Sequence, residues 1–270
     1  MQNNRFDQHT HTSFSFDGDP GATVAGIIEA AIAKGLAGVA VTDHLDPLWP
    51  VEEEPSVIDL PGYEAALSEA EGRYEGRIRF AKGLELGLMP GEALDICQAA
   101  VDGYPYDFVI GSAHTSPETP FDFPAFHEGR GLRDIIDEYY TIFLESIRAY
   151  KNYDVLGHLN YIDRFTDSYA PEGLYMPYVD EILKIAVQDG KGIEYNTSTW
   201  RFRMADRGTP TLPMLRRFKE LGGEIVTIGS DAHSAADVGA FIEKGEETLL
   251  AEGFRYVAVF KGRRPEFIGL

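Results

Sequence analysis

The chain has 270 residues, of which 44% are hydrophobic, and its formal net charge is −20. This charge argues against a general nucleic-acid-binding protein, because such proteins neutralise phosphates with lysine and arginine. No apolar run reaches the about 18 residues that a membrane-spanning helix needs. Residues 1–6 are polar, unlike the start of a signal peptide, and the single cysteine, Cys97, cannot form an internal disulfide. We therefore expect a cytoplasmic protein with no membrane partner.

Short apolar runs typical of strands alternate along the chain with segments of helical periodicity. Strands are predicted at 5–9, 38–42, 78–84, 107–111, 154–157, 192–195, 224–228 and 256–260. Helices are predicted at about 24–34, 63–74, 92–101, 132–147, 177–188, 210–221 and 236–251. Residues 115–131 form a loop of a length usual for a lid or a binding loop.

This alternation predicts the α/β class, with βα units around a parallel sheet. About eight strands favour a closed or nearly closed (β/α) barrel, a single domain over residues 1–270. In such barrels the active site is built from the carboxyl ends of the strands. The alternative is an open doubly wound sheet, which would collect its ligands at one crevice.

Histidine and carboxylate residues stand at or just beyond the ends of these predicted strands. A lone pair such as His9 and His11 is often only two surface residues, although side chains two apart on a strand point to the same side. The full set of candidate metal ligands is His9, His11, Asp17, His44, Glu85, His114, His158, Asp231 and His233. Imidazole mixed with carboxylate favours zinc, iron or manganese. Nine ligands exceed the needs of one ion and suit three divalent ions with positions left for water.

Six segments that carry these residues resemble the polymerase and histidinol phosphatase (PHP) superfamily, and they occur in the family's order over nearly the whole chain. They are His9-Thr-His11, Thr42-Asp-His44, Gly83-Leu-Glu85, Gly111-Ser-Ala-His114, Gly157-His158 and Gly229-Ser-Asp-Ala-His233. The resemblance implies a distorted, TIM-like barrel of the PHP type, commonly seven-stranded, with a trinuclear metal site.

The same resemblance implies how the ligands divide among the three metals. The first metal would be held by His9, His11, Glu85 and Asp231. Glu85 would bridge to a second metal held by His114 and His158, and the third metal would be held by Asp17, His44 and His233. Many members of the family have histidine where this chain has Asp17, although a carboxylate is also a competent ligand.

Two further segments resemble the histidinol-phosphate phosphatase branch of the family: Asp163-Arg-Phe165 and Glu194-Tyr-Asn-Thr-Ser-Thr-Trp-Arg201. By this resemblance Arg164 and Arg201 would clamp the phosphate, with Arg203 as a substitute for Arg201, because guanidinium groups bind phosphate in a fixed fork. Surface ion pairs are the other interpretation of these arginines. Thr199 and Trp200 depart from the usual residues of this segment.

The resemblance implies hydrolysis of L-histidinol phosphate to L-histidinol and phosphate, by attack of a metal-bound hydroxide. Glu52 to Glu54 and Asp122 could recognise the ammonium and imidazole groups, although a run of three glutamates is more often a solvated face. A lid that stacks on the imidazole could be made from Phe121, Phe123, Phe126 and His127, and packing of these rings onto the barrel accounts for them equally well.

Two other functions stay open at this point. One is a PHP phosphoesterase acting on nucleotides or short oligonucleotides, against which the net charge of −20 counts. The other is a non-catalytic metal-binding module, against which the complete ligand set counts. We expect a small phosphate ester as the partner, and we do not expect a nucleic acid.

Overall fold

A parallel sheet organises the chain in the computed structural model, which describes all residues except 1–3, 52–57, 167, 203, 205 and 206. The strands follow one another in space as β1 (Phe6–Asp7), β2 (Gly38–Val41), β4 (Arg79–Gly87), β5 (Phe108–Ser112), β6 (Val155–Leu156), β7 (Gly192–Asn196) and β8 (Val226–Gly229). A two-residue strand, β3 (His44–Leu45), pairs with the carboxyl end of β4.

The sheet curls until its first and last strands meet. The backbone N–H of Gln8 donates to the carbonyl of Ile228 at 3.0 Å, and a parallel bridge joins Thr10 to Ala232. The prediction of a nearly closed barrel is therefore confirmed, and the open doubly wound sheet is wrong.

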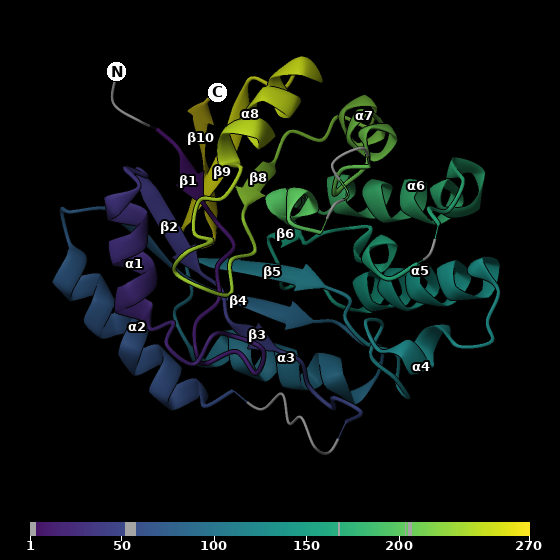
Figure 1. Cartoon of the computed structure of the whole chain (residues 1–270), viewed down its shortest axis with the longest axis horizontal. Helices are drawn as coiled ribbons and strands as arrows, with labels where there is room; N and C mark the ends of the chain where they lie inside the picture. The colour runs from purple at the N-terminus through teal and green to yellow at the C-terminus, as the bar shows by residue number, and fades with distance from the viewer. Residues whose placement is uncertain (1–3, 52–57, 167, 203, 205–206) are drawn as a thin grey trace.

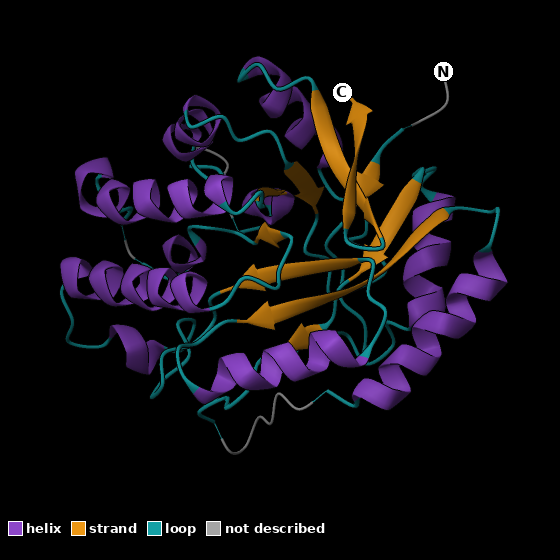
Figure 2. Ribbon diagram, turned by 180° about the vertical axis from the view of Figure 1, so that it is seen from behind, coloured by secondary structure: helices purple, strands orange, loops and turns teal. Residues whose placement is uncertain are grey.

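Helices cover the outside of the strands, with α1 and α2 on one side and α5 and α6 on the other (Figure 1), and the view from behind shows the same arrangement (Figure 2). The helices are α1 (Val24–Ala33), α2 (Leu60–Tyr74), α3 (Glu92–Gly103), α4 (Pro124–His127), α5 (Leu132–Ala149), α6 (Glu172–Gln188), α7 (Leu212–Glu220) and α8 (Ile242–Ala251). Short 3-10 turns follow two strands, η1 (Tyr161–Arg164) after β6 and η2 (Thr197–Trp200) after β7.

Two helices begin five or six residues away from their predicted starts. Helix α6 begins at Glu172 and continues through Pro177, because Tyr175 and Val179 extend its buried face across the proline. Helix α8 begins at Ile242 and not near residue 236. The residue before it, Phe241, has a φ of 60°, a left-handed conformation that a helix cannot include.

The last predicted strand does not join the barrel. Strand β9 (Tyr256–Lys261) pairs antiparallel with β10 (Arg264–Gly269), a strand that we did not predict. Side chains of β9 instead enter the barrel at the amino-terminal end of the strands, where the rings of Phe108 and Phe260 stack with centroids 4.9 Å apart. An alternating apolar run predicts a half-buried strand, but it does not identify the partner strand.

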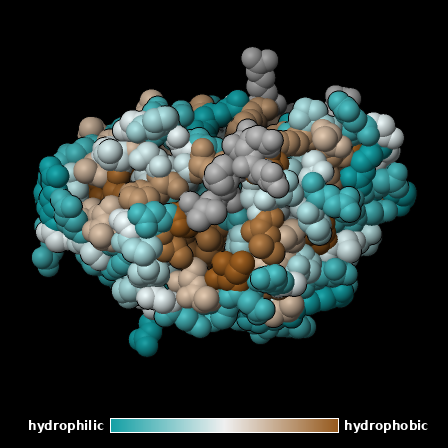
Figure 3. Space-filling model, turned by 90° about the horizontal axis from the view of Figure 1, so that it is seen from below, coloured by the Kyte–Doolittle hydropathy of each residue, from teal (hydrophilic) through white to brown (hydrophobic). Residues whose placement is uncertain are grey.

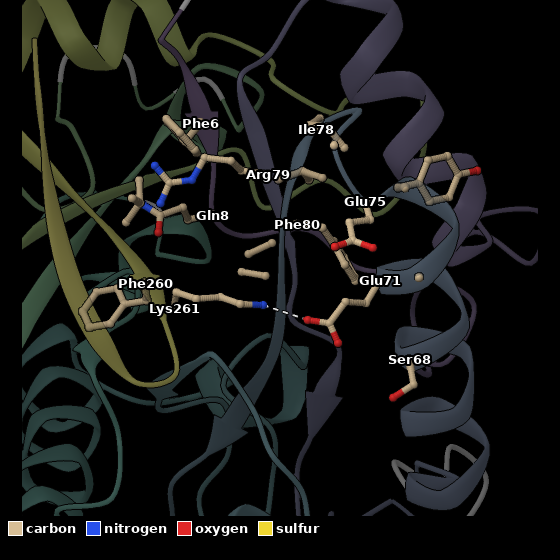
Figure 4. A pocket seen from close by; sticks show the side chains of 17 residues that line it. Phe6, Gln8, Ser68, Glu71, Glu75, Ile78, Arg79, Phe80, Phe260 and Lys261 are labelled. Carbon is tan, nitrogen blue, oxygen red and sulfur yellow. Dashed lines mark hydrogen bonds and ion pairs between the residues drawn. The ribbon is translucent and has the colours of Figure 1, made fainter.

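A cavity of about 650 Å³ lies at this amino-terminal end of the barrel, between α2, the start of β4 and β9 (Figure 4). Charged side chains there pair within the lining: Nζ of Lys261 lies 2.8 Å from Oε1 of Glu71, and the Arg79 guanidinium lies over the Phe6 ring. No histidine is among the described residues that line this cavity. The predicted metal ligands lie instead at the carboxyl ends of the strands.

The surface shown in Figure 3 is mostly hydrophilic, and its hydrophobic side chains gather towards the middle of that face. Among the described helices, none has the length and the apolar character needed to cross a membrane.

Candidate metal centre

Strand pairing brings the predicted ligands together at the carboxyl end of the barrel. The register of β3 with β4 places His44 directly beside Glu85. The bridge between Thr10 and Ala232 places the His9–His11 segment beside the Asp231–His233 segment. Segments more than two hundred residues apart thus meet at one site, because parallel strands end at the same edge of the barrel.

Glu85 lies at the centre of this group and is fully buried. Its Oε1 is 2.9 Å from Nε2 of His158 and 3.4 Å from Nε2 of His114. Its Oε2 is 3.0 Å from Nε2 of His9. Burial by itself would raise the pKa of Glu85, but the charges of His9, His44 and His114 hold it well below its usual value. The two oxygens face different imidazoles, as a carboxylate shared between two metals would.

The ligands predicted for the first metal include His9, His11 and Asp231, whose donor atoms lie within 4.8 Å of one another. Nε2 of His11 lies 3.5 Å from Oε2 of Glu85 and 3.4 Å from Oδ1 of Asp231. This nitrogen is buried and makes no hydrogen bond within the described part of the chain. A buried polar atom without a hydrogen bond is costly, so its place among carboxylates fits a metal ligand.

The ligands predicted for the third metal, Asp17, His44 and His233, include the most exposed side chains of the set. His233 Nε2 lies 3.0 Å from Oδ2 of Asp17, and His44 Nε2 lies 3.8 Å from Oδ1 of the same residue. The side chains of Asp17 and His233 are 43% and 30% exposed. Burial would raise the pKa of Asp17, but the neighbouring imidazoles lower it. Burial would lower the pKa of His44, but Glu85 and Asp17 raise it to about 9.

The structure therefore brings all nine predicted ligands to one site. It also places there two carboxylates that we did not predict as site residues, Asp46 and Glu194. Asp46 is buried with Oδ1 2.7 Å from Nδ1 of His114, and Glu194 is buried with Oε1 2.6 Å from Nδ1 of His9. A signal was present in the sequence, since both acids sit within or just after apolar strand runs.

The two arginines predicted as phosphate clamps lie beside this group in different settings. Arg164 is nearly buried, with Nη2 donating to Ser198 Oγ at 2.7 Å and to Asp231 Oδ2 at 2.9 Å. Its guanidinium lies between the rings of Tyr161 and Phe202, 4.9 and 4.5 Å from their centroids.

Arg201 contacts the backbone of the loop after β8. Its Nη2 donates to the carbonyls of Ser230 and Asp231 at 2.7 and 2.6 Å, and its Nη1 lies 3.3 Å from Oδ2 of Asp237. Arg203, the predicted substitute, is outside the described residues, as are Glu52 to Glu54.

A cavity of about 890 Å³ opens above the predicted ligands. Both arginines line it, together with imidazoles, carboxylates and aromatic rings. The aromatic residues of its wall are Phe16, Trp49, Phe123, Tyr161, Phe165 and Phe202. A phosphate ester with an organic group of moderate size therefore has a charged floor and an apolar wall available.

Some residues of the 115–131 loop pack against the barrel, and others line the cavity. Phe121 and Phe126 are buried, and their rings contact each other and, for Phe121, Tyr139. Asp122 and Phe123 line the cavity. His127 lies outside the ligand group, with Nε2 2.7 Å from the carbonyl of Phe121. Of the two interpretations of these rings, packing onto the barrel therefore holds for Phe121 and Phe126, because large rings gain most from full burial, while Phe123 lines the cavity.

Comparison with known proteins agrees with this geometry. The family model described as the PHP domain matches residues 7–198. A protein named probable histidinol-phosphatase from Clostridium acetobutylicum is 30% identical over 238 residues, covering 87% of this chain and 88% of the relative. A histidinol-phosphatase from Lactococcus lactis subsp. lactis is 28% identical over 264 residues, 96% of each chain.

The structures agree as well. The crystal structure of histidinol phosphate phosphatase from Lactococcus lactis, complexed with zinc, L-histidinol and phosphate, superposes with a TM-score of 0.86. It shares 26% sequence identity and covers 97% of this chain and 99% of that one. The family match spans more than half of the chain, and both the barrel fold and the relatives agree with it. This chain belongs to the PHP domain family.

Proposed function

We propose that this chain is a metal-dependent phosphomonoesterase that hydrolyses L-histidinol phosphate to L-histidinol and phosphate. The observation that carries the proposal is the convergence of nine imidazole and carboxylate side chains at one end of the barrel, beside a cavity that six of them line together with Arg164. The similarity to the zinc, histidinol and phosphate complex supports the choice of substrate.

Three divalent ions would be held by the ligands assigned above, with Glu85 shared between two of them. The mixture of imidazole and carboxylate fits zinc, iron or manganese. When bound, such ions supply Lewis acidity to phosphoryl oxygens and a nucleophile at neutral pH.

The residues of the chain itself would bind and orient the ester. Arg164 is held in place by Ser198, Asp231 and two aromatic rings, so it would meet the phosphate without losing further side-chain freedom. Arg201 lines the same cavity and would act as a second clamp. The rings of Phe123 and Phe165 would shield the organic group from water, and Asp122 would face its cationic end.

The test is phosphate release from L-histidinol phosphate by the chain loaded with manganese or zinc, compared with an aryl phosphate and a nucleoside bisphosphate. We expect turnover of histidinol phosphate that Arg201→Ala and His233→Ala reduce at least about 100-fold, as loss of a charge-stabilising group does. His127→Ala is the matched control, because His127 lies outside the ligand group. Turnover of the aryl phosphate alone would contradict the substrate. Preference for the bisphosphate would favour the nucleotide alternative, and no turnover with metals bound would favour the non-catalytic module.

We also propose that residues 1–270 act as one domain. The strands from β1 to β8 build one sheet, and side chains of β9 pack inside the amino-terminal end of the barrel. The cytoplasmic location stays a prediction.

A further inference from the structure

Glu194 is a buried acid on β7 to which neither the family resemblance nor the proposed mechanism gives a role. Its side chain is 1% exposed, and it does not belong to the nine proposed ligands. Glu194 contacts His9, a proposed ligand of the first metal, so its role rests on the metal ligands of the proposed function.

Three groups surround the two oxygens of Glu194. Oε2 accepts the backbone N–H of His158 and the side-chain amide of Asn196, each at 3.0 Å. Oε1 lies 2.6 Å from Nδ1 of His9. The first two groups are donors, and an ionised carboxylate only accepts.

The orientation of the Asn196 amide is fixed independently of Glu194. Its Oδ1 accepts the backbone N–H of Ser198 at 3.0 Å, and a backbone N–H can only donate. Its Nδ2 must then face Glu194, and the same Nδ2 donates to Oδ2 of Asp231 at 3.3 Å. Glu194 and Asn196 thus form a chain of hydrogen bonds that ends at two proposed ligands of the first metal, His9 and Asp231.

The consequence for His9 is a defined tautomer. Because Oε1 of Glu194 accepts, the Nδ1 of His9 carries the proton that it shares with this oxygen. The other nitrogen, Nε2, then points at the ligand group, 3.0 Å from Oε2 of Glu85 and 3.8 Å from Oδ1 of Asp231. This is the arrangement in which an outer carboxylate orients an imidazole for a metal.

The backbone leaves space for this contact at one glycine. A Cβ added at Gly229 would lie 2.5 Å from Oε1 of Glu194 and 2.3 Å from Cβ of His9. Any larger residue there would push the two side chains apart, so Gly229 is the residue that allows Glu194 to reach His9.

We propose that Glu194 is a positioning residue for the first metal: it holds His9 in the tautomer protonated at Nδ1 and, through Asn196, aligns Asp231. Glutamine cannot replace it, because an amide offers a single acceptor oxygen. Its NH₂ would face either the Nδ1–H of His9 or the N–H groups of His158 and Asn196.

The experiment measures metal binding to the full chain, by metal analysis after dialysis against a graded series of chelator concentrations. Glu194→Gln is compared with wild type, with His9→Ala as the variant that removes a ligand. Asp154→Asn is the matched control: Asp154 is another buried acid, bonded to Arg263 and to the N–H of Val109 at the far end of the strands. A second readout is ¹⁵N NMR of the chain at saturating zinc, where a ligand imidazole is neutral; the spectrum reports which nitrogen of His9 is protonated.

We expect Glu194→Gln to weaken the binding of one metal about 10- to 100-fold, leaving the other metals unchanged. It should also shift His9 away from the Nδ1–H tautomer. Asp154→Asn should lower the melting temperature without changing metal affinity.

Wild-type metal affinity in Glu194→Gln, beside loss of a metal in His9→Ala, would overturn the positioning role and leave the proposed function standing. If His9→Ala loses no metal, both the positioning role of Glu194 and the assignment of His9 as a metal ligand are wrong. A wild-type chain that binds its metals but does not release phosphate from histidinol phosphate would contradict the proposed function alone.

Discussion

Oδ1 of Asp46 lies 2.7 Å from Nδ1 of His114, and the other oxygen of the same carboxylate lies 3.2 Å from Nδ1 of His44. Asp46 is buried, and the two positive imidazoles lower its pKa to about 2 although burial would raise it. One carboxylate therefore contacts imidazoles that the proposed site gives to two different metals.

Asp46→Asn should weaken one metal, either the second or the third. The amide can accept from only one of the two imidazoles, so either His44 or His114 loses its orienting partner. We expect the affinity of the second or the third metal to fall about 10-fold or more, while the first metal stays bound. Metal analysis during chelator titration measures this, and loss of the first metal before the others would contradict it.

Gly87→Ala should disturb the same residue from the backbone side. A Cβ at position 87 would lie 1.9 Å from Oδ1 of Asp46 and 3.2 Å from its Cα, so Asp46 must move. We expect the metal loss of Asp46→Asn, together with a lower melting temperature. Gly72→Ala in α2 is the control, because no atom lies within 4 Å of the added carbon. That change should stabilise the helix by up to about 1 kcal/mol and leave metal binding intact.

The stability of the metal-free chain should fall as the pH rises from about 6.5 to about 9. The pKa of His44 is raised to about 9 by Glu85 and Asp17, against 6.5 for the free side chain. A raised pKa contributes stability that is fully present below the unfolded value and is lost as the pH passes the folded value.

Metal binding should show the opposite trend in the same range, because a ligand imidazole must be neutral. Melting temperatures with and without chelator, from pH 6 to 9.5, measure both trends. A metal-free chain that gains stability over this range would contradict the assignment of the raised pKa to His44.

Phe121 and Phe123 should respond differently to truncation, although a single residue separates them. Phe121 is fully buried against Tyr139 and Phe126, so Phe121→Ala should cost about 3–5 kcal/mol of unfolding free energy. Phe123 lines the cavity, so Phe123→Ala should raise KM for histidinol phosphate with little change in stability. Denaturant unfolding and steady-state kinetics distinguish the two, and equal losses of stability would contradict this division of the loop.

Arg164→Lys should lower kcat/KM about 100-fold although it keeps the charge. Arg164 bonds Ser198 and Asp231 through Nη2 alone, which leaves its other N–H groups for the phosphate, whereas lysine has a single nitrogen for all of these partners. Lysine also lacks the planar group that lies over the rings of Tyr161 and Phe202. Phosphate-release kinetics measure the change. Arg216→Lys is the control, since Arg216 forms an exposed ion pair with Glu252. Equal activity of Arg164→Lys and wild type would show that charge alone suffices.

The gathering of the nine proposed ligands at one site could be predicted from the sequence because its signal is local. His9, His44, Glu85, His158 and Asp231 each stand at or just beyond a short apolar run, and parallel strands place such positions at one edge. The barrel followed from the same alternation of strand and helix periodicity.

Tertiary structure alone decided the remaining features, because each depends on which distant segments meet. Strand β9 has the apolar pattern of a barrel strand, yet it pairs with β10. The ring of its Phe260 packs inside the barrel at the amino-terminal end of the strands. Glu194 meets His9 across 185 residues, and Arg201 bonds to carbonyls of Ser230 and Asp231 that no side-chain pattern marks. A hydrogen bond depends on the position and direction of two atoms, and only the closed fold sets these for residues so far apart in the chain.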